Sequence, residues 1–191
     1  LKFLKFNKIT FDKNTDNELS NINTNGQPNR YIFKNFQWHK LHLFDIKLKQ
    51  WKYIFYIDIN MTIHKDINPI LDIMPEGCIF ANRDANDQQN WELKNQFDIS
   101  HKRFQELSLN YNLSINNYFQ TGMMYFDTNI IQQETKEEIL KLVKKYPITR
   151  TNEQAILNLY FIYHKNLYKQ FSQKINNINT YTYWKNDKNT R

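Results

Sequence analysis

The sequence predicts an α/β protein in which short buried strands alternate with helices. Three apolar runs, at 51–57, 78–81 and 118–126, have the length and composition of strands, and segments with helical periodicity separate or follow them. Because strands joined through helices usually run parallel, we expect a mostly parallel sheet flanked by helices. We also expect a single domain over residues 1–191, since this length is typical of one hydrophobic core.

The first part of the chain contains a polar stretch between two ordered segments. Residues 1–11 read as a short strand, and residues 12–29 are rich in Asn with Gly26 and Pro28 as breakers, which predicts an irregular connection. Residues 30–46 then place aromatic and leucine side chains three or four positions apart. This spacing predicts a partly amphipathic helix.

Polar clusters follow the apolar runs. The run at 51–57 is almost continuously apolar, as in a strand covered on both faces, and it stops at Asp58. The run at 78–81 ends in the polar cluster 82–84. Open α/β sheets bind ligands beyond the carboxyl ends of their strands, so these ends predict a site.

Three helices are expected in the second half of the chain. Residues 101–111 form the first. The second begins at a capping residue at position 128 or 129 and ends before Pro147, and the third begins at a capping residue at position 151 or 152. These helices complete the alternation of strands and helices.

Charge and cysteine content restrict the function classes. The net charge is +7 and the pI is near 9.3, which suits contact with phosphate, nucleotide or acidic surfaces. The 21 Lys outnumber the 5 Arg, which argues against readers of nucleic-acid base edges. The single cysteine, Cys78, excludes an internal disulfide and fits a reducing, cytoplasmic compartment. No stretch approaches the roughly 18 apolar residues of a membrane span, so we expect a soluble protein.

Asp58 and Asn60 are the first candidate for chemistry. They flank Ile59 at alternating positions, and on an extended segment their side chains would point the same way. Their oxygens suit a hard divalent cation such as Mg²⁺ or Mn²⁺, which could bridge phosphates. The same pattern is typical of an Asx turn at the end of a strand, so the residues alone leave both interpretations open.

Several segments resemble motifs of one enzyme family, and they follow one another along the chain in the same order as in that family. Residues 51–71 resemble the region around the Asp-x-Asp metal motif of GT-A nucleotide-sugar glycosyltransferases, especially the glycogenin-like group, glycosyltransferase family eight. Upstream, Lys34 stands at the basic position of the helix that precedes this motif. Downstream, three stretches resemble the strand with the sugar-contacting Asp, the Asn-Ser-Gly strand and the Asp-Gln segment. The resemblance covers about residues 30–163.

This resemblance implies a Rossmann-like GT-A domain that transfers a sugar, with retention of anomeric configuration, from a nucleotide sugar. The expected donor is a uridine diphosphate sugar and the expected acceptor a hydroxyl of a glycan or protein, with Mn²⁺ or Mg²⁺ as cofactor. The implied site residues are Asp58 and Asn60 for the metal, Lys34, Asp84, Gln120, Thr121 and Gly122 for the diphosphate and donor sugar, and Glu153 and Gln154 beside the reacting carbon.

The sequence also departs from the family pattern. Asn60 and Glu153 each stand where the family has Asp, and Gln120 stands where it has Asn. The family's first strand and its later His-containing segment are not recognisable, so we expect the domain to lack these terminal segments. Two alternatives therefore stay open: a degenerate domain that binds a nucleotide, glycan or protein partner without catalysis, and a basic nucleic-acid-associated protein. In the polar loop, Trp91 is the aromatic residue best placed to meet a sugar ring.

Overall fold

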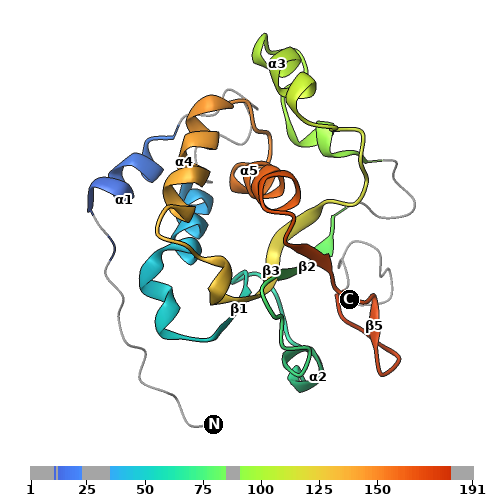
Figure 1. The fold of residues 1–191 in the computed structure, drawn as a ribbon. Helices are drawn as coiled ribbons and strands as arrows, with labels where there is room; N and C mark the ends of the chain where they lie inside the picture. The colour runs from blue at the N-terminus through green and yellow to red at the C-terminus, as the bar shows by residue number, and fades with distance from the viewer. Residues whose placement is uncertain (1–10, 12, 23–34, 85–90, 182–191) are drawn as a thin grey trace.

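A four-stranded sheet in the order β1-β3-β2-β4 forms the centre of the fold (Figure 1). The computed structural model describes residues 11, 13–22, 35–84 and 91–181. The expected strand over 1–11, apart from its last residue, and the candidate Lys34 lie outside these ranges. The strands are β1 (Tyr53–Ile57), β2 (Ile79–Arg83), β3 (Phe119–Asp127) and β4 (Tyr168–Gln170).

The sheet is mixed, and the expectation of a mostly parallel sheet is wrong. β3 runs antiparallel to both β1 and β2, and only β2 and β4 pair in parallel. The cause is the connection between β2 and β3, whose described part, residues 91–118, carries α3 (Arg103–Asn110) and stays beyond one end of the sheet instead of crossing a face (Figure 1). The chain re-enters the sheet where it left, with the Asp84 N–H donating to the Tyr118 carbonyl at 2.9 Å.

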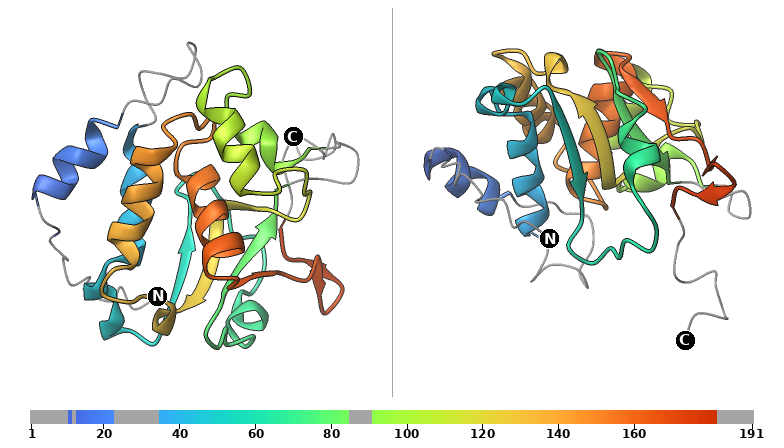
Figure 2. Two further views of the ribbon diagram at one scale, coloured as in Figure 1. Left: turned by 45° about the horizontal axis from the view of Figure 1, so that its top comes forward. Right: turned by 90° about the horizontal axis from the view of Figure 1, so that it is seen from below.

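Side chains of β3 alternate between two apolar clusters, as a strand covered on both faces requires. Met124 and Phe126 belong to the larger core, which also holds residues of η2 (Asn35–Phe44), α4 (Thr135–Lys145) and α5 (Glu153–Asn158). Met123 and Tyr125 face a smaller cluster that includes residues of the short helix α2 (Asn68–Leu71). Figure 2 shows η2, α4 and α5 on one side of the sheet and α2 on the other.

The helix expected over 30–46 is present as the 3₁₀ helix η2. Trp38, Leu41 and Phe44 are fully buried and recur every three residues. A 3₁₀ helix has about three residues per turn, so this spacing aligns all three side chains on one face. The same period aligns Gln37 with Lys40 on another face.

Two local expectations are wrong. Residues Lys13–Ser20 form helix α1, so the stretch 12–29 is not wholly irregular. Neither position 128 nor position 129 caps α4, because Thr128–Ile130 forms the separate 3₁₀ turn η5 and α4 begins after Glu134. The remaining elements are η3 (Ile46–Gln50), η4 (Leu93–Gln96), the π-helix η6 (Leu159–His164), β5 (Lys174–Ile175) and β6 (Ile178–Asn179).

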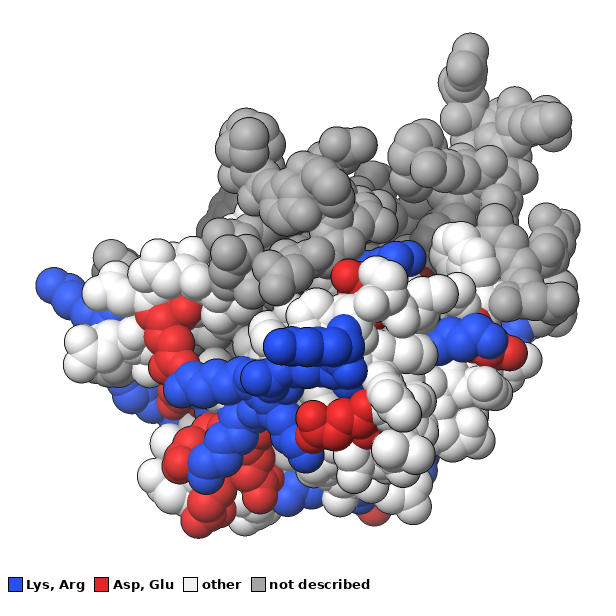
Figure 3. Space-filling view, turned by 90° about the horizontal axis from the view of Figure 1, so that it is seen from above, with Lys and Arg blue, Asp and Glu red and all other residues white. Residues whose placement is uncertain are grey.

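Surface charge is interspersed on the face seen from above. Figure 3 shows Lys and Arg side chains lying beside Asp and Glu side chains on that face. Exposed ion pairs such as Lys141–Glu137 and Lys145–Glu106 join the two signs on the helices. On this face, the described residues therefore do not form the continuous basic surface that the nucleic-acid hypothesis needs. Within the described ranges, none of the helices has the length and apolar content needed to cross a membrane.

Candidate functional site

The site lies at the edge of the sheet where β1 and β2 end and β3 begins. The Asp58 N–H, just past β1, donates to the Gly122 carbonyl in β3 at 2.8 Å. On the other side of β3, Arg83 at the end of β2 pairs with Phe119. The sequence predicted a site beyond carboxyl ends of strands. Because β3 is antiparallel, it contributes residues from its amino end instead.

A pocket of about 480 Å³ opens at this edge. Residues that are far apart in the sequence meet in it, since η2, the positions just past β1 and β2, the start of β3 and the start of α5 all contribute side chains. Seven of the nine site residues implied by the resemblance line it. They are Asp58, Asp84, Gln120, Thr121, Gly122, Glu153 and Gln154.

Asn60 does not line the pocket. The strand ends at Ile57 and the chain turns at 59–60, which leaves Ile59 and Asn60 exposed. The premise that Asp58 and Asn60 sit on one extended segment is therefore wrong. Across the described ranges, no three His, Cys, Asp or Glu side chains group as a metal site would require. The described donor set does not fit a divalent ion, and we derive no step through one.

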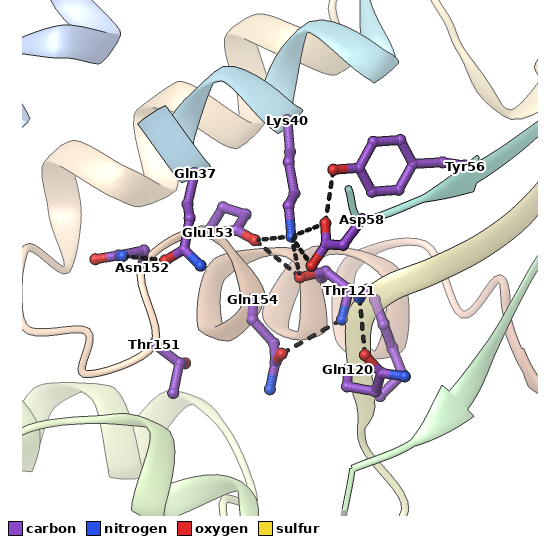
Figure 4. Close-up of polar contacts among 12 residues, drawn as sticks. Gln37, Lys40, Tyr56, Asp58, Gln120, Thr121, Thr151, Asn152, Glu153 and Gln154 are labelled. Carbon is purple, nitrogen blue, oxygen red and sulfur yellow. Dashed lines mark hydrogen bonds and ion pairs between the residues drawn. The ribbon is translucent and has the colours of Figure 1, made fainter. Parts of the chain in front are cut away.

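Lys40 is the cation at the centre of the pocket (Figure 4). Its Nζ lies 2.9 Å from Asp58 Oδ1 and 3.0 Å from Glu153 Oε1, and it donates to Thr121 Oγ1 at 3.3 Å. The Lys40 residue is only 9% exposed. Sequence reasoning missed this residue because it assigned the basic position to Lys34. The three-residue spacing of η2, which puts Gln37 and Lys40 on one face, was the available signal.

Two acidic residues share this cation but differ in environment. Glu153 is almost completely buried, and burial raises the pKa of its carboxyl while Lys40 and Thr121 oppose that shift. Its Oε2 atom has no hydrogen-bond partner among the described residues. Asp58 is partly exposed and accepts a 2.7 Å hydrogen bond from the Tyr56 hydroxyl, whose pKa is raised by burial and by Asp58. Burial and the contacts with Lys40 and Thr121 thus act on the pKa of Glu153 in opposite directions, and Lys40 compensates the charge of this buried carboxylate.

A network of side-chain amides forms the opposite part of the pocket. Gln154 accepts from the Thr121 N–H at 3.3 Å and donates to Asp84 Oδ2 and to Gln96 Oε1, both at 3.0 Å. Gln96 donates to the same Asp84 oxygen at 3.1 Å and accepts from the Thr151 hydroxyl. Gln154 thus connects β3 with the end of β2 and with η4.

Two Asn residues hold the helix that carries Glu153 and Gln154. Asn158, fully buried in α5, donates to the Phe119 carbonyl at 2.7 Å and accepts from the Phe119 N–H at 2.8 Å. Asn152, at the expected capping position, makes no side-chain cap bond, and its amide instead donates to Gln37 at 2.6 Å. Its φ of 52° is a left-handed value that is uncommon for a residue other than Gly. Both contacts fix α5 against β3 and η2.

Sequence reasoning missed several pocket residues on the far wall. That wall carries Trp91, the aromatic residue singled out from the sequence. It also carries residues of η4 and of the segment before α5, whose sequences show no hydrophobic periodicity. The missed residues on it are Asn95, Gln96, Arg150 and Thr151.

The fold and the site define an α/β protein with a polar pocket at the strand ends of a mixed sheet. Comparison with known proteins finds no matching family profile. The chain is similar to galactinol synthase 1 of Arabidopsis thaliana, with 27% identity over 135 residues, 64% of this chain and 37% of that protein. It is also similar to galactinol synthase 5 of the same plant, with 25% identity over 140 residues, 68% of this chain and 40% of that protein. The chain thus spans about two fifths of the length of the relatives it matches.

Proposed function

We propose that this chain is a glycosyltransferase that moves a sugar from a nucleotide sugar to an acceptor hydroxyl. The similarity to galactinol synthases supports the class, because these relatives are glycosyltransferases of family eight. The donor proposed from the resemblance is a uridine diphosphate sugar, and the acceptor is a glycan or protein.

The observation that carries the proposal is the convergence of Asp58, Asp84 and Glu153 on one pocket. These carboxylates come from three segments separated by 26 and 69 positions in the numbering of the chain. Each is a residue that the resemblance implies for metal, donor-sugar or reacting-carbon contact. Acidic residues without a common role are not expected to line the same pocket.

We assign the donor sugar to the region around Asp84, Gln120 and Gly122. Carboxylate and amide groups bind sugar hydroxyls through directional hydrogen bonds. The Gln120 side chain accepts from the Gly122 N–H at 2.8 Å, so it lies folded over its own strand. A Cβ at position 122 would stand 2.6 Å from Gln120 Oε1, and glycine at this position therefore leaves room for that arrangement.

We assign Glu153 and Gln154 to the neighbourhood of the reacting carbon. In the transfer, the bond between the anomeric carbon and the diphosphate oxygen breaks, and the acceptor oxygen forms the new bond. The acceptor's proton leaves to the departing diphosphate. A carboxylate near this carbon stabilises the positive charge that develops on the sugar. Lys40 holds Glu153 in place for this role, and retention of configuration is carried over from the resemblance.

Calorimetric titration with uridine diphosphate and with a uridine diphosphate sugar, followed by a donor-hydrolysis assay, tests the proposal. We expect saturable binding of both by the wild type. In Asp84→Ala we expect binding of the nucleotide sugar to weaken roughly tenfold, since a hydrogen bond from the sugar to a charged group is lost on truncation. Asp72→Ala is the matched control, because Asp72 is exposed and does not line the pocket.

Each titration is run with and without Mn²⁺. Nucleotide binding without turnover of any uridine diphosphate sugar would support the non-catalytic alternative. Absence of nucleotide binding under both conditions would refute the proposal.

A further inference from the structure

The wall of the pocket that carries Trp91 has no assigned role. Two segments build it, and the Arg150 N–H donates to the Gln96 carbonyl at 2.7 Å where they meet. A β-bridge between Phe97 and Thr149 continues the contact. Backbone hydrogen bonds therefore hold the two segments of this wall together, and Trp91, Gln96 and Arg150 all line the same pocket.

Its chemistry matches a ring with an apolar face and a rim of hydroxyls. Trp91 is 46% exposed although it lines the pocket, so its indole is available to a ligand. Gln96 is only 4% exposed, and its amide is held in one orientation by Asp84, Gln154 and Thr151. Aromatic rings pack against the C–H face of a sugar, and fixed amides select its hydroxyls.

The charge of the pocket favours an uncharged ligand on this wall. Lys40 directs its ammonium at Asp58, Glu153 and Thr121. The Arg150 guanidinium lies 3.6 Å from Asp98, which offsets its charge. On this wall, an anionic acceptor would meet only Arg150 among the described lining cations, and Asp98 already pairs with it.

We propose that the Trp91 wall is the acceptor subsite and that it takes an uncharged sugar ring. The proposal rests on the proposed function. The ring packs on Trp91 and directs its hydroxyls toward the exposed side chain of Asn95, while Gln96 holds the wall in place through its bonds to Asp84, Gln154 and Thr151. Gln154 contacts Thr121 on the donor side and Gln96 on this wall, so a ring held here lies next to the donor sugar. Figure 4 shows the Gln154 side chain between Thr121 and Thr151.

Trp91→Ala tests this subsite, with Trp51→Ala as the matched control. Trp51 is exposed to a similar extent, 40%, and does not line the pocket. Saturation-transfer NMR titrations use three neutral probes, namely methyl galactoside, methyl glucoside and maltose, each in the presence of uridine diphosphate. We expect Trp91→Ala to weaken binding of the best neutral probe roughly tenfold, and Trp51→Ala to leave it unchanged. Affinity for uridine diphosphate stays within about twofold in both variants. Glucuronate, the charged counterpart of glucose, binds less tightly than methyl glucoside.

The possible failures are distinguishable. If the wild type binds uridine diphosphate but none of the neutral probes, the subsite proposal is wrong and the proposed function stands. The subsite proposal is also overturned if Trp91→Ala weakens binding of the nucleotide and leaves binding of the saccharide unchanged, because the wall then holds the base of the donor. If saccharide binding depends on Trp91 and uridine diphosphate does not bind at all, the Trp91 wall is still a saccharide-binding surface. The proposed function and the acceptor role are then both wrong. Melting curves of both variants establish that they are folded.

Discussion

Replacing Lys40 by Met removes the cation that compensates the most deeply buried carboxylate of the pocket. Lys40 is 9% exposed and Glu153 is 1% exposed, and their ion pair spans 3.0 Å. Breaking a buried pair by removing one partner costs about 3–5 kcal/mol, because the remaining charge stays desolvated. We expect Lys40→Met to lose stability of this order at pH 8, measured as the free energy of unfolding from urea titrations.

The loss depends on pH in a defined direction. Burial already raises the pKa of Glu153 above its usual value, and removal of Lys40 removes an interaction that lowers it. A carboxyl whose folded-state pKa is raised favours the folded state at low pH, and this contribution is lost as pH rises through the folded-state pKa. The penalty of Lys40→Met is therefore smaller at pH 5, where Glu153 can take up a proton, than at pH 8.

Two further variants separate this explanation from simple loss of packing. Lys40→Met combined with Glu153→Gln leaves no buried charge at position 153, so we expect most of the lost stability to return. Lys141→Met removes an exposed ion pair with Glu137 and should leave stability unchanged. A penalty below about 1 kcal/mol at pH 8, or one that is equal at both pH values, would refute the reasoning.

Two other substitutions test how the site is held. Gly122→Ala places a Cβ 2.6 Å from Gln120 Oε1, which forces that side chain off the Gly122 N–H. We expect a loss of about 1 kcal/mol in stability and weaker binding of a uridine diphosphate sugar by calorimetry, and unchanged binding of that sugar nucleotide would contradict the donor-sugar assignment. Asn158→Leu leaves the buried N–H and carbonyl of Phe119 without their partner. We expect a loss of about 2–4 kcal/mol by calorimetric melting, and a melting temperature equal to that of the wild type would contradict the role of this contact.

β1, β2 and β3 were predictable because each is an apolar run that ends at a polar residue. β4 was not expected, since its sequence, Tyr-Lys-Gln, has no apolar run. β1 begins two residues inside the expected range and ends at its last residue, Ile57. The direction of β3 was not predictable from periodicity, since an apolar run has the same pattern in either orientation. Only the connection that carries α3, which returns the chain to the same end of the sheet, decides it.

The acidic members of the site were predictable and the members that organise it were not. Asp58 and Asp84 follow strands and so stand out as polar residues at strand ends. Lys40 lies inside a helix, where a lysine is usually solvent-exposed, and only the tertiary structure buries it. Gln96 belongs to a four-residue 3₁₀ turn with no hydrophobic pattern to mark it. The extended segment expected for Asp58 and Asn60 is absent because the chain turns directly after β1.

The paired hydrogen bonds between Asn158 and Phe119 have a consequence for motion. They couple the helix bearing Glu153 to the strand bearing Thr121, so these two parts of the pocket shift together as a rigid body. The hydrogen bond from the Thr121 hydroxyl to Glu153 Oε1, 2.8 Å long, lies inside this coupled unit. A displacement of α5 therefore carries the start of β3 with it and keeps Glu153 and Thr121 at the same spacing.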